Sequence, residues 1–208
     1  MKIKRTMSAV ALAALLNGCV LPSPIERHDA TRDQQSGYVS SAARTRSAYG
    51  YVLHLKNTAT DATYALQINS GFPIERVFDG PDTPPQINMI KVPPGNYTLT
   101  GWSAYEWGTH MKRIEKKFDA LSSFAEPFSV APGAVVFLGD FVTDDQVTRR
   151  SLSYASVHYK IIPQPIGVDV ARDEFVNAYP TFKEASFTCR FCSFDESAGR
   201  RTFRFTAP

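Results

Sequence analysis

The sequence predicts an all-β domain, mainly an antiparallel β-sandwich, with one short helix and a terminal hairpin near the C-terminus. Short segments in which apolar and polar residues alternate recur along the chain, which is the pattern of half-buried strands. Turns that contain proline and glycine separate these segments, and helical spacing of apolar residues is scarce. Many short strands joined by such turns are typical of sandwiches and barrels.

A hairpin is expected first. The segment YGYVLHLKN, residues 49–57, carries apolar residues at every second position from Tyr51, which predicts a strand with one buried face. The segment TYALQINSG, residues 63–71, has strand composition too. The polar residues between the two segments, 57–62, predict the turn that joins them.

Two further strand–turn–strand units follow. The segment 87–107 contains Pro93-Pro94-Gly95-Asn96, and the segment 126–143 contains Ala131-Pro132-Gly133. Proline fixes φ for a turn and glycine supplies a positive φ, so each group predicts a turn between two strands. Asp144-Asp145 is expected in a further turn, and residues 149–163 are expected to form one more strand.

One helix is expected in VDVARDEFVNAYPTFKEA, residues 168–185. Its apolar residues lie near helical spacing, with Asp169 as the candidate N-cap and Pro180 as the residue that ends or kinks the helix. The spaced residues are Val170, Phe175, Ala178 and Phe182. After it, ASFTCRFCSF and RRTFRFTAP, separated by a polar stretch, predict a C-terminal hairpin.

The N-terminus has the layout of an export signal. Lys2, Lys4 and Arg5 precede an apolar run from Met7 to Leu16. That run is too short to span a bilayer, which takes about 20 apolar residues. It ends in LNGC, residues 16–19, a tetrapeptide that resembles the lipobox of bacterial lipoproteins.

The lipobox resemblance implies that residues 1–18 are a signal peptide that is removed, and that the Cys19 thiol carries lipid. Two or more acyl chains anchor a protein stably where one chain is marginal. Val20 and Leu21 follow the cysteine, without an aspartate, which by resemblance to enteric lipoproteins implies the outer membrane, facing the periplasm. The alternative is a secretory signal followed by an incidental cysteine.

The charge balance gives no support to nucleic-acid binding. The chain has 23 basic and 20 acidic residues, and residues 1–18 contribute three basic residues and no acidic one. The mature chain is therefore formally neutral, whereas nucleic-acid binding requires a concentrated basic face.

Polar composition also divides the mature chain. Residues 19–47 carry many polar residues with little apolar periodicity, so they are expected to form the lipidated cysteine and a flexible tether. Residues 48–208 are long enough for one domain.

The segments VPPGNYTLTGW and FSVAPGAVVFLGDF resemble β-sandwich domains of proteobacterial envelope lipoproteins, many of unknown function. The resemblance covers about residues 85–142, with Phe137 where those domains have a tyrosine. It implies a fold like prealbumin or the regulatory domain of carboxypeptidases, and it implies no activity.

Cys189 and Cys192 form CRFC. Export to an oxidising compartment favours a disulfide between them. In a straight strand residues three apart lie about 10 Å apart, too far for a bridge, so a disulfide requires a turn or a bulge at Arg190-Phe191. Two free thiols, or redox or metal chemistry, are the alternatives.

Trp102, Tyr105 and Trp107 lie close together in the sequence and form a possible ligand or partner surface, because aromatic rings stack on sugars; core packing is the alternative. The insert HMKRIEKKFDALSSF, residues 110–124, has apolar residues near helical spacing among basic ones. It is expected to be either a basic flap on a membrane or partner, or a plain surface helix or hairpin.

No motif for a nucleophile, a phosphate loop or a metal site occurs in the sequence, so we expect no catalytic residue, cofactor or metal. The predicted function is a non-enzymatic accessory or assembly subunit, anchored to the lipid bilayer through Cys19 and binding another envelope protein. The alternative is a module that binds glycan or peptidoglycan through the region of Trp102, Tyr105 and Trp107.

Overall fold

The computed structural model describes residues 24–25, 30–45, 47–70, 85–106, 108–151 and 154–192. In chain order the elements are β1 (Gly37–Thr45), β2 (Tyr49–Asn57), β3 (Thr63–Ser70), β4 (Gln86–Val92), β5 (Gly95–Glu106), β6 (Lys112–Lys117), β7 (Phe128–Val130), β8 (Val135–Ser151), β9 (Tyr154–Gln164), α1 (Val168–Ala178) and β10 (Phe187–Cys189). Short 3₁₀ turns lie at Ser123–Ala125 and Pro180–Phe182.

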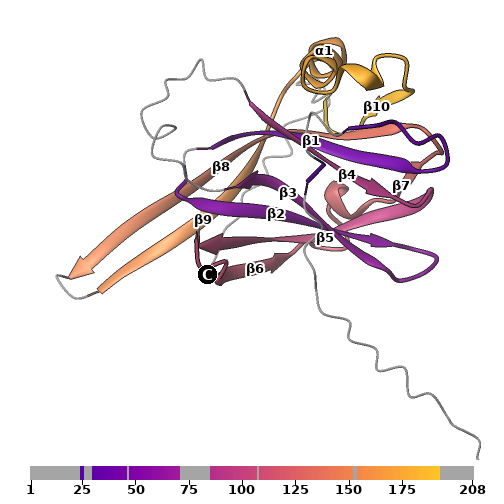
Figure 1. Ribbon diagram of the computed structural model, residues 1–208. Coiled ribbons are helices and arrows are strands. Elements are labelled where there is room, and N and C mark those ends of the chain that lie inside the picture. Colours follow the sequence, from indigo (N-terminus) through magenta and orange to yellow (C-terminus); the bar gives the residue numbers. More distant parts are fainter. Residues whose placement is uncertain are drawn as a thin grey trace, which may run out of the picture.

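The strands form two sheets packed face to face, which confirms the predicted all-β sandwich with one helix (Figure 1). The first sheet has the order β10-β8-β1-β4, with β9 also paired to β8, and the second has the order β3-β2-β5-β6, with β7 also paired to β5. Most pairs are antiparallel, but β8 runs parallel to both β1 and β10. Helix α1 covers the outer face of the first sheet (Figure 1).

Two apolar layers follow from this arrangement. Between the sheets lies the larger one, which includes Tyr51, Leu53, Phe141 and Trp102. The second layer lies between the first sheet and α1 and is built around Phe175. Strands of the first sheet are therefore covered on both faces, whereas the second sheet is covered on its inner face by the sandwich core.

The predicted hairpin of residues 49–57 and 63–71 is confirmed, because β2 and β3 pair antiparallel around the turn at 58–62. The second proline turn is present at Pro132-Gly133, whereas the first is a bend at Pro94 after which Gly95 and Asn96 begin β5. Each of them joins strands of different sheets: β4 lies in the first sheet and β5 in the second, and β7 lies in the second sheet and β8 in the first. These turns thus close the sandwich instead of forming hairpins.

The prediction that residues 19–47 form a flexible tether is wrong for their second half. Residues 37–45 are β1, which lies inside the first sheet between β4 and β8. Its central residues are the small Ser40, Ser41, Ala42 and Ala43, all buried. At these four positions the strand is packed closely on both faces by small side chains, and their low hydrophobicity made the segment resemble a linker.

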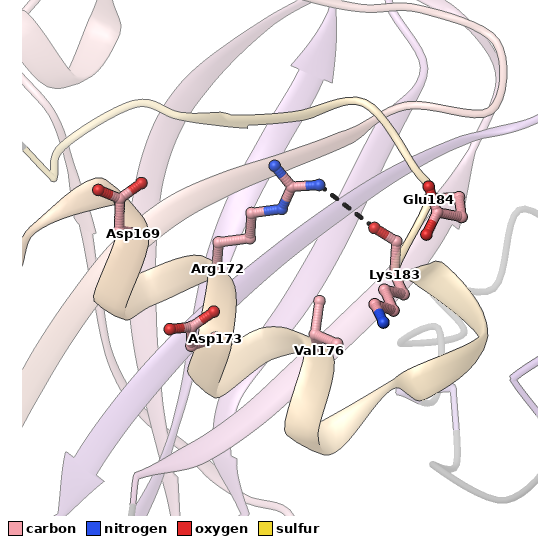
Figure 2. Close-up of a pocket in the computed structure, with 6 residues that line it drawn as sticks. All are labelled: Asp169, Arg172, Asp173, Val176, Lys183 and Glu184. Atoms are coloured by element: carbon pink, nitrogen blue, oxygen red, sulfur yellow. Dashed lines mark hydrogen bonds between the residues drawn. The ribbon is translucent and has the colours of Figure 1, made fainter.

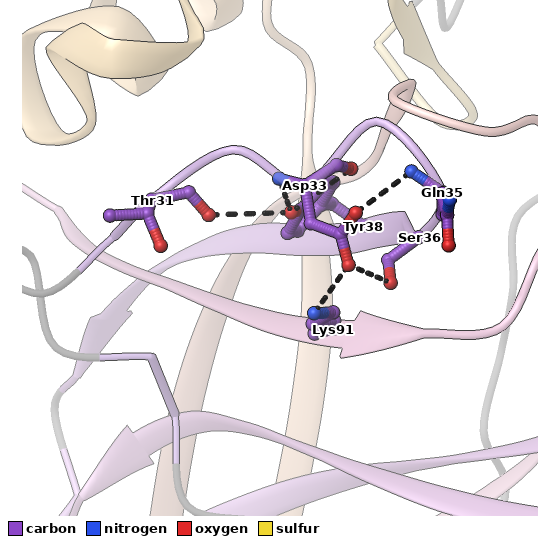
Figure 3. Close-up of polar contacts among 6 residues, drawn as sticks. All are labelled: Thr31, Asp33, Gln35, Ser36, Tyr38 and Lys91. Carbon is purple, nitrogen blue, oxygen red and sulfur yellow. Dashed lines mark hydrogen bonds and ion pairs between the residues drawn. The ribbon is translucent and has the colours of Figure 1, made fainter.

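The residues before β1 are fastened to the domain too. The Asp33 carboxylate accepts hydrogen bonds from the Gln35 backbone N–H at 2.9 Å and the Ser36 hydroxyl at 2.8 Å, and pairs with Lys91 of β4 at 2.7 Å (Figure 3). Together these contacts, led by the one to Lys91, lower the pKa of Asp33 to about 2. The hydroxyl of Tyr38, which is buried under α1, accepts a hydrogen bond from the Asp33 backbone N–H at 2.6 Å.

Helix α1 begins two residues earlier than the capping pattern predicts. Gly167 is the N-cap and gives no side-chain cap, so the prediction of Asp169 as N-cap is wrong; Asp169 lies in the first turn, where a carboxylate suits the helix dipole. The helix ends before Pro180, as expected. Val170 is 54% exposed, whereas Phe175 and Phe182 are buried against the first sheet.

One further prediction is wrong, and two other segments can be compared with what was expected of them. Asp144 and Asp145 lie inside β8, because this strand continues from Val135 to Ser151 and takes up residues that were expected in a turn and in a separate strand. The basic insert has no helix beyond the 3₁₀ turn Ser123–Ala125; residues 112–117 form β6, paired to β5, which agrees with the plain hairpin alternative. Of the expected C-terminal hairpin, β10 pairs with β8, and residues 193–208 lie outside the described residues.

Candidate functional site

Cys19 and Trp107 both lie outside the described residues. Trp102 does not line a surface: it is 4% exposed and stacks on Tyr51 in the sandwich core, with ring centroids 5.8 Å apart. The prediction that Trp102 forms part of a ligand surface is therefore wrong, because β5 turns this side chain inward. Tyr105 is half-buried, at the far end of the same strand.

Cys189 and Cys192 form a disulfide in the structure, with Cα atoms 5.5 Å apart. The chain bends at residues 190–192, directly after β10, and this bend brings the two cysteines together. The closed loop presents Arg190 and Phe191 to the neighbouring segment 123–126, and Phe191 is buried.

That loop holds the edge of the first sheet against the chain that follows β6. Arg190 donates hydrogen bonds to the Ser123 carbonyl at 3.3 Å and to the Glu126 carboxylate at 2.8 Å. The Phe191 ring lies 4.7 Å from that of Phe124 in the sandwich core. We therefore interpret the disulfide as a structural clamp.

The described residues contain no group of three or more side chains suited to hold a metal ion. A shallow hollow of about 450 Å³ lies between α1 and the chain that follows the second 3₁₀ turn (Figure 2). It is lined by Asp169, Arg172, Asp173, Val176, Lys183 and Glu184. Arg172 donates to the Lys183 carbonyl at 3.2 Å across it. This lining offers carboxylates and cations but no histidine, serine or cysteine.

A partly buried ionic cluster links α1 to the first sheet. Arg44 of β1 contacts Asp140 of β8 at 3.2 Å and Glu174 of α1 at 3.5 Å. Burial raises the pKa of both carboxyl groups, while the Arg44 guanidinium opposes that rise. One oxygen of each carboxyl is buried without a hydrogen-bond partner among the described residues. Sequence reasoning missed this cluster, because its members lie far apart in the chain.

The feature best suited to bind another molecule is the far end of the β8–β9 hairpin, which projects beyond the other strands (Figure 1). We call residues 146–151 and 154–160 the arm. The neighbouring strand β1 pairs with β8 only as far as Thr143, and β10 pairs only with residues 135–137. Among the strands that the structure describes, the arm strands therefore pair with each other alone.

The root of the arm is held firmly by both sheets. Tyr51 of the second sheet donates its hydroxyl to the Asp144 carbonyl at 2.7 Å, and the Asp145 carboxylate accepts from the Ala48 backbone N–H at 3.2 Å. The rings of Tyr49 and Tyr159 meet edge to face with centroids 4.9 Å apart. The arm is therefore a rigidly based projection.

Beyond this root the arm is exposed. Val147 is 57% exposed and lies directly opposite the half-buried Val157, on the face that continues the inner face of the first sheet. Gln146, Thr148 and His158 on the other face are exposed as well. Unpaired strand edges offer backbone N–H and C=O groups to another strand, and a ribbon of two strands alone is only marginally stable in water.

No helix within the described part of the chain has the length and apolar character needed to cross a membrane. No family model matches the chain, and no curated protein matches it in sequence. A leucine-rich repeat protein from Bacteroides thetaiotaomicron VPI-5482 is similar in structure, with a TM-score of 0.34 and 12% identity over 66% of this chain. The match covers 19% of the Bacteroides chain, and a likeness this weak carries no conclusion about fold or function.

Proposed function

We propose that this chain is an exported lipoprotein, anchored to the cell envelope through acylated Cys19, which binds another envelope protein through the arm and has no enzymatic activity of its own. The observation that carries the binding role is the arm itself, which extends past the sandwich and whose outer edges pair with no other strand in the described part of the chain (Figure 1). Addition of a strand to such an edge is a common way to recognise a partner.

Support for the anchor comes from the sequence, in which an export signal ends directly at the cysteine of LNGC. By resemblance to enteric lipoproteins, Val20 and Leu21 favour the periplasmic face of the outer membrane.

The early start of the folded domain makes the attachment short. The backbone N–H of Ile25 donates to the Met89 carbonyl of β4 at 2.9 Å. Ile25 is six positions after Cys19, and a fully extended chain of this length spans at most about 20 Å. An anchor at Cys19 therefore holds the β4 side of the domain close to the bilayer, so we place the partner at the same membrane or within short reach of it.

The binding role is tested in cells by a photoreactive residue at Val147 on the arm, with one at the exposed Val170 of α1 as the matched control. We expect a defined crosslinked product at Val147 that is absent at Val170. Equal products at both positions, or no product at Val147, would overturn the role of the arm.

The anchor is tested by separating membrane from soluble fractions for the wild type and Cys19→Ser. We expect the wild type in the membrane fraction, with lipid on the N-terminal cysteine by mass spectrometry, and the variant in the soluble fraction. If both forms are soluble, the lipoprotein proposal is wrong, whereas the crosslinking result still decides the role of the arm.

A further inference from the structure

We propose that the partner contributes an extended segment in which acidic and apolar residues alternate, and that this segment pairs with the outer edge of β9. The inference rests on the proposed function, because it names the chemistry of the partner at the same arm.

The edge of β9 is the longer of the two open edges. Among the described strands β9 pairs with β8 alone along its whole length, whereas β8 is free only beyond Thr143. Pro163, near the end of β9, has no backbone N–H and limits the usable edge to about residues 154–162. That length suits a strand of ordinary size.

The arm is basic. Residues 146–160 contain Arg149, Arg150 and Lys160 but no aspartate or glutamate, which gives a formal charge of +3. Lys160 is exposed, and its ammonium donates a hydrogen bond to the Gln146 amide oxygen at 2.7 Å, whereas no carboxylate among the described residues pairs with it. Asp144 and Asp145 precede the arm in β8: Asp144 lies directly opposite Lys160 in the strand pairing, and the Asp145 carboxylate accepts a hydrogen bond from the Ala48 backbone N–H.

The two faces of the arm differ, and this difference sets the pattern of the added strand. His158 and Lys160 share the face toward which α1 lies, and Val157 lies on the opposite face with Val147. Side chains of a strand beside β9 alternate between the same two faces. Acidic residues therefore fit beside Lys160, and apolar residues fit beside Val157, since opposite charges and apolar pairs stabilise neighbouring strands.

Two other occupants fit less well. A second copy of this chain, paired arm to arm, would bring two clusters of charge +3 together, and like charges in register are unfavourable. Insertion of the arm into hydrocarbon would bury its unpaired backbone groups without partners, which is costly in a bilayer. A strand from an acidic protein segment satisfies both the charges and the backbone.

The probe for this inference is a fluorescent peptide that alternates glutamate with valine, long enough to cover the β9 edge. A matched peptide replaces every glutamate by lysine, and a third replaces the central valine by N-methylvaline, which removes a backbone donor. Binding to the full mature protein in neutral detergent micelles is followed by fluorescence anisotropy at low and high salt.

We expect the glutamate peptide to bind at least about tenfold more tightly than the lysine peptide at low ionic strength, with the difference shrinking at about 1 M salt, where the screening length falls to about 3 Å. N-methylation should weaken binding. Lys160→Glu should reduce the preference for glutamate, whereas Lys183→Glu, the same charge change at an exposed position after α1, should leave it unchanged.

Each other outcome decides a separate point. Equal affinity for the glutamate and lysine peptides overturns the acidic partner but leaves strand addition and the proposed function standing. If neither peptide binds while the crosslink at Val147 persists in cells, strand addition to β9 is wrong although the arm still binds a protein. Absence of both peptide binding and crosslink overturns this inference together with the proposed function.

Discussion

Replacing Arg44 by methionine removes the cation that the carboxyls of Asp140 and Glu174 share beneath α1. The contacts are 3.2 and 3.5 Å long, and the Asp140 side chain is only 4% exposed. Loss of one partner from a fully buried ion pair costs about 3–5 kcal/mol, because the remaining charge stays buried. The Arg44 side chain is 35% exposed, so water screens part of the interaction. We therefore expect Arg44→Met to lower the free energy of unfolding by about 2 kcal/mol.

Asp140→Asn should have a different effect from the arginine variant. The amide keeps the size of the side chain but removes the charge whose burial raises the pKa of Asp140. We therefore expect a change of less than about 1 kcal/mol from this substitution alone, because replacing a buried charge with a neutral group offsets the lost ion pair. In the Arg44→Met background the same substitution should restore stability, giving a coupling energy of about 1–2 kcal/mol.

The pH dependence follows from the direction of the two pKa shifts. A carboxyl whose native pKa is raised binds more protons in the folded than in the unfolded chain, so its contribution to stability falls as pH rises from the unfolded-state value, near 4, through the native value. The loss of unfolding free energy caused by Arg44→Met should thus be larger at pH 8 than at pH 5. Asp33, with its pKa lowered to about 2, stays ionised throughout this range and does not contribute to the difference.

Urea unfolding followed by tryptophan fluorescence measures these differences, since Trp102 lies in the sandwich core. The wild type, both single variants and the double variant are compared at pH 5 and pH 8. Our account of the cluster is refuted if Asp140→Asn destabilises as much as Arg44→Met, or if the deficit of Arg44→Met is the same at both pH values.

Three further predictions concern the core and the clamp. Phe175→Ala removes the central side chain of the layer beneath α1 and should lower the free energy of urea unfolding by about 3–5 kcal/mol. The control Val170→Ala, at an exposed position, should lower it by less than about 0.5 kcal/mol. Similar losses in the two variants would contradict the packing of α1. At Gly101 a Cβ would lie 2.2 Å from a carbonyl oxygen of β6, so Gly101→Ala should destabilise by about 2 kcal/mol and expose the amides of β6 to hydrogen exchange; unchanged protection would argue against this close approach. The Cys189–Cys192 disulfide closes a short loop, so its reduction should lower stability by about 2 kcal/mol, and titration of the native mature protein should find neither thiol free; two reactive thiols would refute the clamp.

Local sequence patterns predicted the parts of the fold that depend on neighbouring residues. The alternation around Tyr51 predicted β2, and the polar residues 57–62 predicted the turn after it, because side-chain period and turn chemistry are properties of the segment itself. Pro180 marked the end of α1 for the same reason. The disulfide was one of the alternatives that the CRFC spacing left open, and the bend at residues 190–192 favours it.

Local patterns failed where position in the fold determines the residue type. The small residues 40–43 form a fully buried strand, although the same composition occurs in linkers, because only the packing of β1 between β4, β8, α1 and the second sheet excludes larger side chains. Trp102 faces inward because of its place in β5, and the sequence alone left both orientations open.

The sequence by itself determined the strand-rich character of the chain, most of its turns and the motif at Cys19, since each depends on residues that are neighbours in the chain. Tertiary structure alone decided that β8 continues through Asp144-Asp145 and that its second half pairs only with β9 among the described strands. It also decided that Arg44, Asp140 and Glu174 meet where α1 packs on the first sheet. These features arise from contacts between residues tens of positions apart, whose closeness is set by the pairing and stacking of the two sheets.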